Sequence, residues 1–161
     1  MALLSEADRR SAKRSRGSPD PTAEASLGFW LRHAHRAFVR ALARELAPHG
    51  ILPAQWTVLR ALWSRDGVTQ VALAERIGVE KASLTGVLAG LEHAGLVRRE
   101  RDPLDGRKLA VRLTPAGRRL QAKLRGCGEA VNRRAAQGVP PAALADFTAL
   151  LRTLAGNLEG E

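Results

Sequence analysis

The chain of 161 residues has very little cysteine and no long apolar run. Its single cysteine, Cys127, excludes an internal disulfide and argues against a cysteine-based zinc site. No apolar run approaches the roughly 18 residues of a membrane-spanning helix, and the mixed charges of residues 1–20 are not those of a secretory signal. With 45% apolar residues, the composition indicates one globular domain, or one domain and an extension, and a reducing cytoplasm fits it.

Catalytic and metal-binding motifs are missing as well. The sequence contains no G-x-S-x-G, no H-E-x-x-H, no P-loop and no cluster of carboxylates. His33 and His35 are two residues apart, and such neighbours point in different directions on a helix, which favours surface or structural histidines over a metal pair. Cys127 is expected to be a small buried apolar residue rather than an oxidation sensor. We therefore expect neither an enzyme nor a cofactor.

Positive charge is abundant and unevenly placed. Lysine and arginine number 26 against 16 acidic residues, a net charge of +10. Residues 98–125 alone hold ten basic and three acidic residues, a net charge of +7. This concentration favours a surface that binds phosphates. The alternative is a basic composition that only aids solubility.

The first half of the chain reads as a basic tail followed by helices. Residues 1–25 are low in large apolar residues and indicate a flexible tail, whose alternative is a variable terminus without a role. From Ser26, apolar residues recur at helical spacing up to Pro48 and Gly50. Their coverage is wide and indicates a helix buried on more than one side, as at a dimer seam; they are Leu27, Trp30, Leu31, Ala34, Phe38, Leu42 and Leu46.

Three further helices follow at the spacing of a helix-turn-helix. One begins at Pro53 and ends before Asp66 and Gly67; the next is capped by Thr69 and ends at Gly78. The third follows after a short turn and ends near residue 95. Its inward side chains are Leu84, Val87, Leu88 and Leu91, and its outward positions are Lys81, Ser83, Thr85 and Gly86.

The stretch RDPLDGRKLAVRLT, residues 101–114, predicts a β-hairpin. Strands are expected over residues 97–101 and 108–113, with Leu109, Val111 and Leu113 on the buried face and a charged tip between them. A long helix then begins with Thr114 as cap and Pro115 in its first turn. A last helix follows residues 139–141, and its apolar stripe is Leu144, Phe147, Leu150, Leu151 and Leu154.

The hairpin sequence resembles the wing of MarR-type regulators, which reads roughly D-x-x-D-x-R-x-x-x-V-x-L-T-x-x-G. The matching positions are Asp102, Asp105, Arg107, Val111, Leu113, Thr114 and Gly117. Residues 91–97 resemble the family's L-E-x-x-G-L-V, and residues 52–59 resemble its second helix. The resemblance covers residues 26 to about 158, and its motifs are specific when taken together.

The resemblance implies a mainly α fold with a small β-hairpin wing. Residues 51–113 would form a winged helix-turn-helix lobe, and residues 26–50 and 114–161 a dimerisation region. It also implies a homodimer that binds pseudo-palindromic, double-stranded operator DNA, most often as a repressor released by a small molecule. The alternative is an architectural or nonspecific nucleic-acid-binding protein, which the same net charge would suit.

DNA-contacting residues follow from this arrangement. A helix can enter the major groove, and a basic hairpin tip can reach the minor groove. The tip contributes Arg107 as the minor-groove residue, with Asp105 beside it; their alternative is a surface ion pair. Phosphate contacts are expected from Arg98, Arg99, Arg101 and Lys108. Major-groove contacts are expected from Gln70, Lys81, Ser83 and Thr85, and the alternative for Ser83 and Thr85 is that they are solvated helix residues.

Glycines stand in the recognition helix where many such regulators carry arginine. Gly86 and Gly90 remove candidate base-reading side chains, so specificity is expected to lean on DNA shape. The family's effector pocket implies a ligand site here at Trp30, His33, Arg36 and Trp56. Aromatic walls and a cation suit an aromatic carboxylate. The alternative is that both tryptophans belong to the core and that Arg36 or His33 pairs across the dimer.

Overall fold

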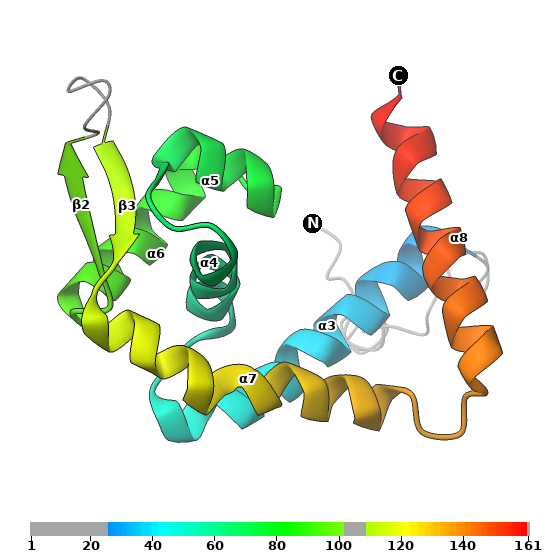
Figure 1. The fold of residues 1–161 in the computed structure, drawn as a ribbon. Coiled ribbons are helices and arrows are strands. Elements are labelled where there is room, and N and C mark those ends of the chain that lie inside the picture. The colour runs from blue at the N-terminus through cyan, green and yellow to red at the C-terminus, as the bar shows by residue number, and fades with distance from the viewer. Residues whose placement is uncertain (1–25, 102–108, 161) are drawn as a thin grey trace, which may run out of the picture. The chain divides into compact units, whose positions relative to one another are not determined.

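A computed structural model describes residues 26–101 and 109–160 (Figure 1). The chain forms two compact units, and the boundary between them, at Ala37 and Phe38, falls within the first described helix. The predicted tail of residues 1–25 lies outside the described residues.

The described elements confirm a mainly α chain with a small β-sheet. Their order and bounds are α3 (Leu27–Leu46), a 3-10 turn η1 (Ala47–His49), α4 (Pro53–Ser64), β1 (Val68–Thr69), α5 (Gln70–Ile77), α6 (Lys81–His93), β2 (Val97–Arg101), β3 (Leu109–Leu113), α7 (Pro115–Ala135) and α8 (Pro141–Glu159). The helix-turn-helix is α5 and α6, and the described part of the wing is β2 and β3.

Helix ends follow the signals in the sequence. The Thr69 hydroxyl accepts a hydrogen bond from the Ala72 amide at 3.2 Å, which caps α5. Gly78 ends the same helix in the left-handed conformation that glycine adopts without strain. Pro53 and Pro115 occupy the first turns of α4 and α7, where a missing amide costs no hydrogen bond.

The wing sheet has three strands, where the sequence predicted two. The strands are antiparallel in the order β1-β3-β2, and Val68 and Thr69 of β1 pair with Val111 and Ala110 of β3. A two-residue strand is too short to show alternation in a sequence. This pairing also corrects the predicted buried face, because Ala110 in the central strand is fully buried and Leu109, at the end of the ladder, is 50% exposed.

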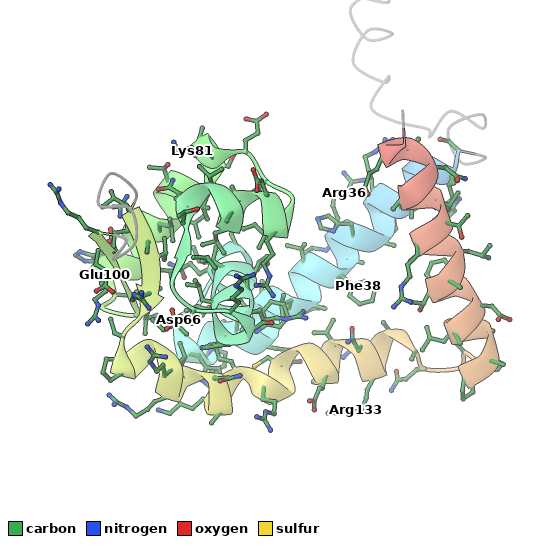
Figure 2. All side chains as sticks on the ribbon, turned by 45° about the horizontal axis from the view of Figure 1, so that its top comes forward. Arg36, Phe38, Asp66, Lys81, Glu100 and Arg133 are labelled. Carbon is green, nitrogen blue, oxygen red and sulfur yellow. The ribbon has the colours of Figure 1, made fainter. Side chains whose placement is uncertain are left out.

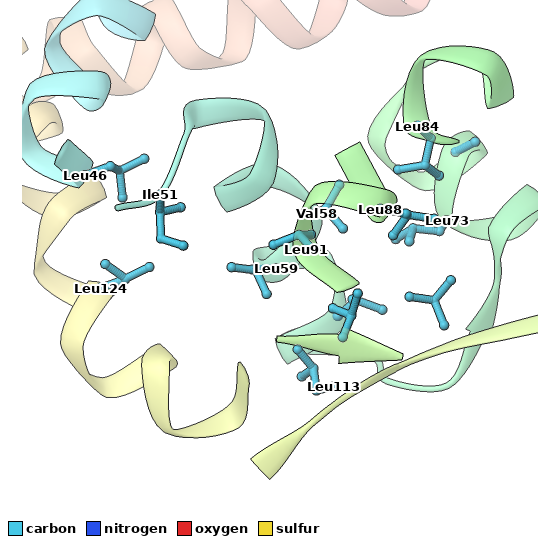
Figure 3. Packing of buried hydrophobic residues seen from close by; sticks show 14 of the residues in the cluster. Leu46, Ile51, Val58, Leu59, Leu73, Leu84, Leu88, Leu91, Leu113 and Leu124 are labelled. Carbon is cyan, nitrogen blue, oxygen red and sulfur yellow. The ribbon is translucent and has the colours of Figure 1, made fainter. Parts of the chain in front are cut away.

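The hydrophobic core joins the last residue of α3, helices α4, α5 and α6, the sheet and α7 as far as Cys127 (Figure 3). No polar or charged residue within the described ranges is buried. The buried residues of the core include Val58, Leu59 and Leu62; Leu73; Leu84, Leu88 and Leu91; Val97, Val111 and Leu113; and Leu124. Each inward position predicted for α6 is confirmed: Leu84, Leu88 and Leu91 are buried, and Val87 is half-buried and packs against the core.

The predicted burial of α3 on more than one side is not present within a single chain. Of its residues only Leu46 is buried, while Leu27, Trp30, Leu31, Phe38 and Val39 are exposed. Helix α8 contains no buried residue. Periodicity identified the apolar faces of these helices, but it does not say whether the same chain covers them.

A tight joint connects the end of α6, the sheet and the start of α7. The Leu96 carbonyl accepts the Thr114 amide at 3.0 Å, and the Thr114 hydroxyl donates to the Gly95 carbonyl at 2.7 Å. The Gly117 amide donates to that hydroxyl at 3.1 Å, and the Gly117 carbonyl accepts the Trp63 indole at 2.9 Å. Only glycine fits at position 117, because a Cβ there would overlap the Leu96 carbonyl oxygen.

Asp66 ties the end of α4 to the sheet. Its Oδ1 accepts the Gly67 and Leu113 amides, each at 2.9 Å. Its Oδ2 lies 2.8 Å from the Arg118 guanidinium on α7. One carboxylate therefore fixes the turn before β1, the end of β3 and the start of α7.

Replacing Gly117 by alanine is expected to destabilise the protein by about 1–3 kcal/mol, because the new methyl group must displace backbone. Gly126→Ala in the same helix is the matched control, since a Cβ there meets open space. That variant should match or exceed wild-type stability by up to about 1 kcal/mol. Urea unfolding measures both. Equal stabilities of the two variants would contradict the close approach at Gly117.

Asp66→Ala is expected to lower the free energy of unfolding by about 1–3 kcal/mol, because the Leu113 amide loses its acceptor. Asp66→Asn keeps that acceptor and removes only the charge facing Arg118, a pair worth about 0–1 kcal/mol at an exposed site. Denaturant titration of the two variants separates these contributions. If Asp66→Asn lowers the free energy of unfolding as much as Asp66→Ala does, the ion pair with Arg118 and not the hydrogen bond to the Leu113 amide provides the stability.

Candidate nucleic-acid interface

Three of the four predicted major-groove residues gather where the N-terminus of α5 meets α6. Lys81, the first residue of α6, is exposed and labelled in Figure 2. Thr85 is exposed one turn further along on the same side of α6, and Gln70, the first residue of α5, is half-buried. Ser83 is also exposed, but it is two residues from Lys81 and from Thr85 and therefore lies on a different side of the helix. The structure therefore brings three of the four predicted residues together at the N-termini of α5 and α6, and it leaves Ser83 apart from them.

Two of these residues are directly linked. The Gln70 side-chain amide donates to the Thr85 hydroxyl at 2.8 Å. The same hydroxyl donates to the Lys81 carbonyl one turn earlier, at 3.0 Å. This contact could not be predicted from the sequence, because Gln70 and Thr85 are 15 positions apart and belong to different helices.

The outer face of α6 is bare. Ala82, Gly86 and Ala89 are exposed and share one face at helical spacing. A Cβ at Gly86 would meet open space, whereas a Cβ at Gly90 would lie 3.2 Å from the Gln55 side chain on α4. Of the two recognition-helix glycines, only Gly86 therefore leaves an open position on the surface.

Wing arginines differ in how they are held. Arg98 is 58% exposed, and its Nε lies 3.0 Å from Glu100. Glu100 also pairs with Arg112 on β3. Arg101 is exposed and pairs with Leu109 at the outer end of the ladder. The three predicted tip residues, Asp105, Arg107 and Lys108, lie outside the described residues.

Arg99 binds within the protein. Its backbone amide and Nε donate to the two Glu92 carboxylate oxygens, each at 3.0 Å. The guanidinium hydrogen bonds hold the pKa of Glu92 below its usual value, against the effect of burial. A lowered pKa means that this pair stabilises the fold above the carboxyl's ordinary pKa and loses that contribution as the pH falls. Arg99, expected among the phosphate contacts, thus anchors β2 to α6.

The predicted ligand residues fall in both compact units. Trp30 and His33 are in ring contact, with centroids 5.8 Å apart, and Arg36 is exposed on the same helix. Trp56 belongs to the second unit and is half-buried. Its ring packs against Gly128 of α7, where a Cβ would lie 3.0 Å away.

A groove of about 330 Å³ runs beside Trp56 between α4 and α5. The Arg60 guanidinium lies 4.8 Å from the Trp56 ring centroid, a cation–π contact. Arg76 of α5 and Ser64 of α4 also line this groove, and the Arg76 guanidinium donates to the Ser64 hydroxyl at 3.0 Å. The two arginines were not singled out in the sequence, because arginine on a surface helix carries no specific signal.

Cys127 and the histidines belong to no metal-binding group among residues 26–101 and 109–160. There, no group of three histidine, cysteine or acidic side chains could hold a metal ion. Cys127 is buried as predicted, and burial, followed by the nearby Glu45, raises the pKa of its thiol. No described helix is long and apolar enough to cross a membrane.

Comparison with known proteins gives one consistent family. Residues 51–109 match the MarR family model. The chain is 35% identical over 119 residues to the HTH-type transcriptional regulator TtmR of Methylorubrum extorquens, covering 73% of this chain and 61% of TtmR. It is 31% identical over 116 residues to the HTH-type transcriptional regulator FarR of Neisseria gonorrhoeae, covering 72% of this chain and 77% of FarR.

Solved structures agree. The BpsR structure from Bordetella bronchiseptica, whose DNA binding is regulated by 6-hydroxynicotinic acid, superimposes with a TM-score of 0.78 at 28% identity. That match covers 86% of this chain and 98% of BpsR. The matched segment spans only 58–61% of the length of TtmR and of two further curated regulators. Sequence motifs, the three-stranded wing and these likenesses together show that the chain belongs to the MarR family of DNA-binding transcriptional regulators.

Proposed function

We propose that this chain is a sequence-specific regulator that acts in the cytoplasm as a homodimer on a pseudo-palindromic operator. The observation that carries the proposal is the polar surface at the N-termini of α5 and α6, where hydrogen bonds bring Gln70, Lys81 and Thr85 together. Ser83 is exposed on another side of the same turn of α6. A helix-turn-helix docks this part of its second helix in the major groove, where base edges are distinguishable.

The wing supplies the second contact. Arg98 and Arg101 lie on β2 beside the recognition helix and bind phosphates in this proposal. Arg107, with Asp105 and Lys108 beside it, reaches the adjacent minor groove from the tip. A two-fold dimer would place its half-sites about one helical turn apart.

The dimer is formed by residues 26–50 and 114–161, outside the winged-helix lobe of residues 51–113. Helix α8 has apolar side chains that remain exposed in the single chain, with Phe147 at 54% and Leu150 at 61%. Helix α3 exposes its own apolar set. Exposed apolar surface on this scale marks a protein–protein contact, and a second copy of the chain covers it in this proposal.

A small aromatic carboxylate is the proposed effector. The chain represses while it is bound to its operator, and the effector releases it from the DNA and so relieves repression. Support comes from BpsR, whose regulator is 6-hydroxynicotinic acid. The residues assigned are Trp30, His33, Arg36 and Trp56, and the Arg60 guanidinium beside Trp56 adds a cation to the groove. A ligand that prefers one spacing of the two lobes would shift the dimer toward or away from the DNA-competent state.

An architectural, nonspecific DNA binder is the second candidate. The bare outer face of α6 and the net charge of +10 favour it.

Selection of bound fragments from genomic DNA by the purified protein, at near-physiological salt, decides between the two. A few sites that share one pseudo-palindrome are expected, with a preference of about 10³-fold or more over random DNA. Broad, salt-sensitive binding without a shared motif would instead establish the architectural function. The genes beside the selected sites then indicate which carboxylates to test.

Lys81→Ala should weaken binding to all sequences and lower the slope of log affinity against log salt by about one. The exposed Arg133 on α7, outside the basic stretch of residues 98–125, provides the control, and Arg133→Ala should leave both quantities unchanged. Fluorescence anisotropy over a salt series measures them. An unchanged salt slope for Lys81→Ala removes this lysine from the DNA contact.

Phe147→Asp with Leu150→Asp should convert the dimer to a monomer that retains its helical content, because neither side chain belongs to the core. Ala149→Asp adds charge to the opposite side of α8 and serves as control. Sedimentation velocity gives the oligomeric state. A dimer that survives the double substitution would show that α8 does not form the interface.

A further inference from the structure

We propose that Gln70, held in place by Thr85, reads an adenine in the major groove of each operator half-site. The inference rests on the proposed function and names the base that this pair recognises. Thr85 acts as a positioning residue, and Gln70 is the group that touches the base.

The hydrogen-bond chain fixes which way the Gln70 amide points. The Thr85 hydroxyl has one proton, and it donates that proton to the Lys81 carbonyl at 3.0 Å. It can therefore only accept from Gln70, so the Gln70 nitrogen faces it at 2.8 Å. The amide oxygen and the second N–H of Gln70 remain for a partner outside the protein.

This remaining pair of groups matches adenine. Adenine presents an acceptor, N7, and a donor, the 6-amino group, on its major-groove edge. The free N–H of Gln70 can donate to N7 while its oxygen accepts from the amino group. Guanine presents two acceptors on the same edge, so the Gln70 oxygen would face O6 without a proton between them.

The bare face of α6 explains how a residue of the neighbouring helix can reach a base. Ala82, Gly86 and Ala89 project little or nothing from the exposed side of α6, and Gly86 leaves open space. The helix can therefore lie closer to the base edges than one that carries long side chains. Gln70, at the start of α5, then comes within range of a base pair at the groove edge.

Gln70 is also restrained before it binds. Its side chain is half-buried and tied to Thr85, whereas a free glutamine side chain must lose rotamer freedom on binding. The restrained Gln70 amide loses less rotamer freedom when it binds. More of the hydrogen-bond energy that distinguishes adenine from other bases therefore remains in the net affinity.

The test starts from the operator selected by the full-length protein. Wild type is expected to prefer adenine at one position of each half-site by about tenfold or more. Replacing that adenine by 7-deazaadenine, or by purine without the 6-amino group, should lower affinity in wild type. Gln70→Ala should abolish the preference at this position and leave the other positions unchanged, and Gln121→Ala, exposed on α7, should behave as wild type.

Thr85 is tested in the same assay with a matched pair. Thr85→Val removes the hydroxyl at nearly constant shape and should reduce the adenine preference, whereas Thr85→Ser keeps the hydroxyl and the preference. Thermal unfolding followed by circular dichroism verifies that each variant is folded. Wild-type discrimination in Thr85→Val would overturn the positioning role.

The outcomes separate this inference from the proposed function. If wild type selects a palindrome and Gln70→Ala keeps every base preference, or loses affinity equally for all sequences, the adenine contact is wrong and the specific regulator stands. If wild type selects no shared sequence, both are overturned.

Discussion

The close approach of Gly117 to the Leu96 carbonyl is the constraint on which the DNA-binding lobe depends. Hydrogen bonds connect three segments here: Thr114, which follows the wing, bonds to Gly95 and Leu96 after α6, and Gly117 in the first turn of α7 bonds to Thr114. Any side chain at position 117 would force the backbones apart. The motif of threonine followed three residues later by glycine is therefore a packing requirement: the threonine caps α7 and the glycine lets α7 begin against α6.

Two carboxylates, Asp66 and Glu92, add further contacts that hold the wing against the helices of the DNA-binding lobe. Asp66 links the turn before β1 to β3 and α7, and Glu92 links α6 to β2 through Arg99. Each accepts a backbone amide of the sheet, so each determines where a strand lies as well as balancing a charge. The recognition helix and the wing are thereby held at a set distance, which a helix and a hairpin that must enter neighbouring grooves require.

Much of the fold could be predicted from residue patterns. Periodicity identified α4 to α8, and Thr69, Thr114, Pro53 and Pro115 marked helix starts, because capping and proline placement are local effects of a few neighbouring residues. Strand β1 could not be predicted, since its two residues owe their conformation to pairing with β3. The buried face of β3 was misassigned at Leu109 and Ala110 for the same reason: burial there depends on where the sheet ends and on a third strand.

The candidate site divides in the same way. The sequence by itself determined the helix-turn-helix, the basic wing and the polar positions of the recognition helix, because spacing and charge are properties of the chain. Only the tertiary structure decided that Arg99 is committed to Glu92, that Gly90 lies against Gln55, and that Gln70 and Thr85 form one unit. Contacts between residues far apart in sequence depend on how the helices pack, and no local pattern records them.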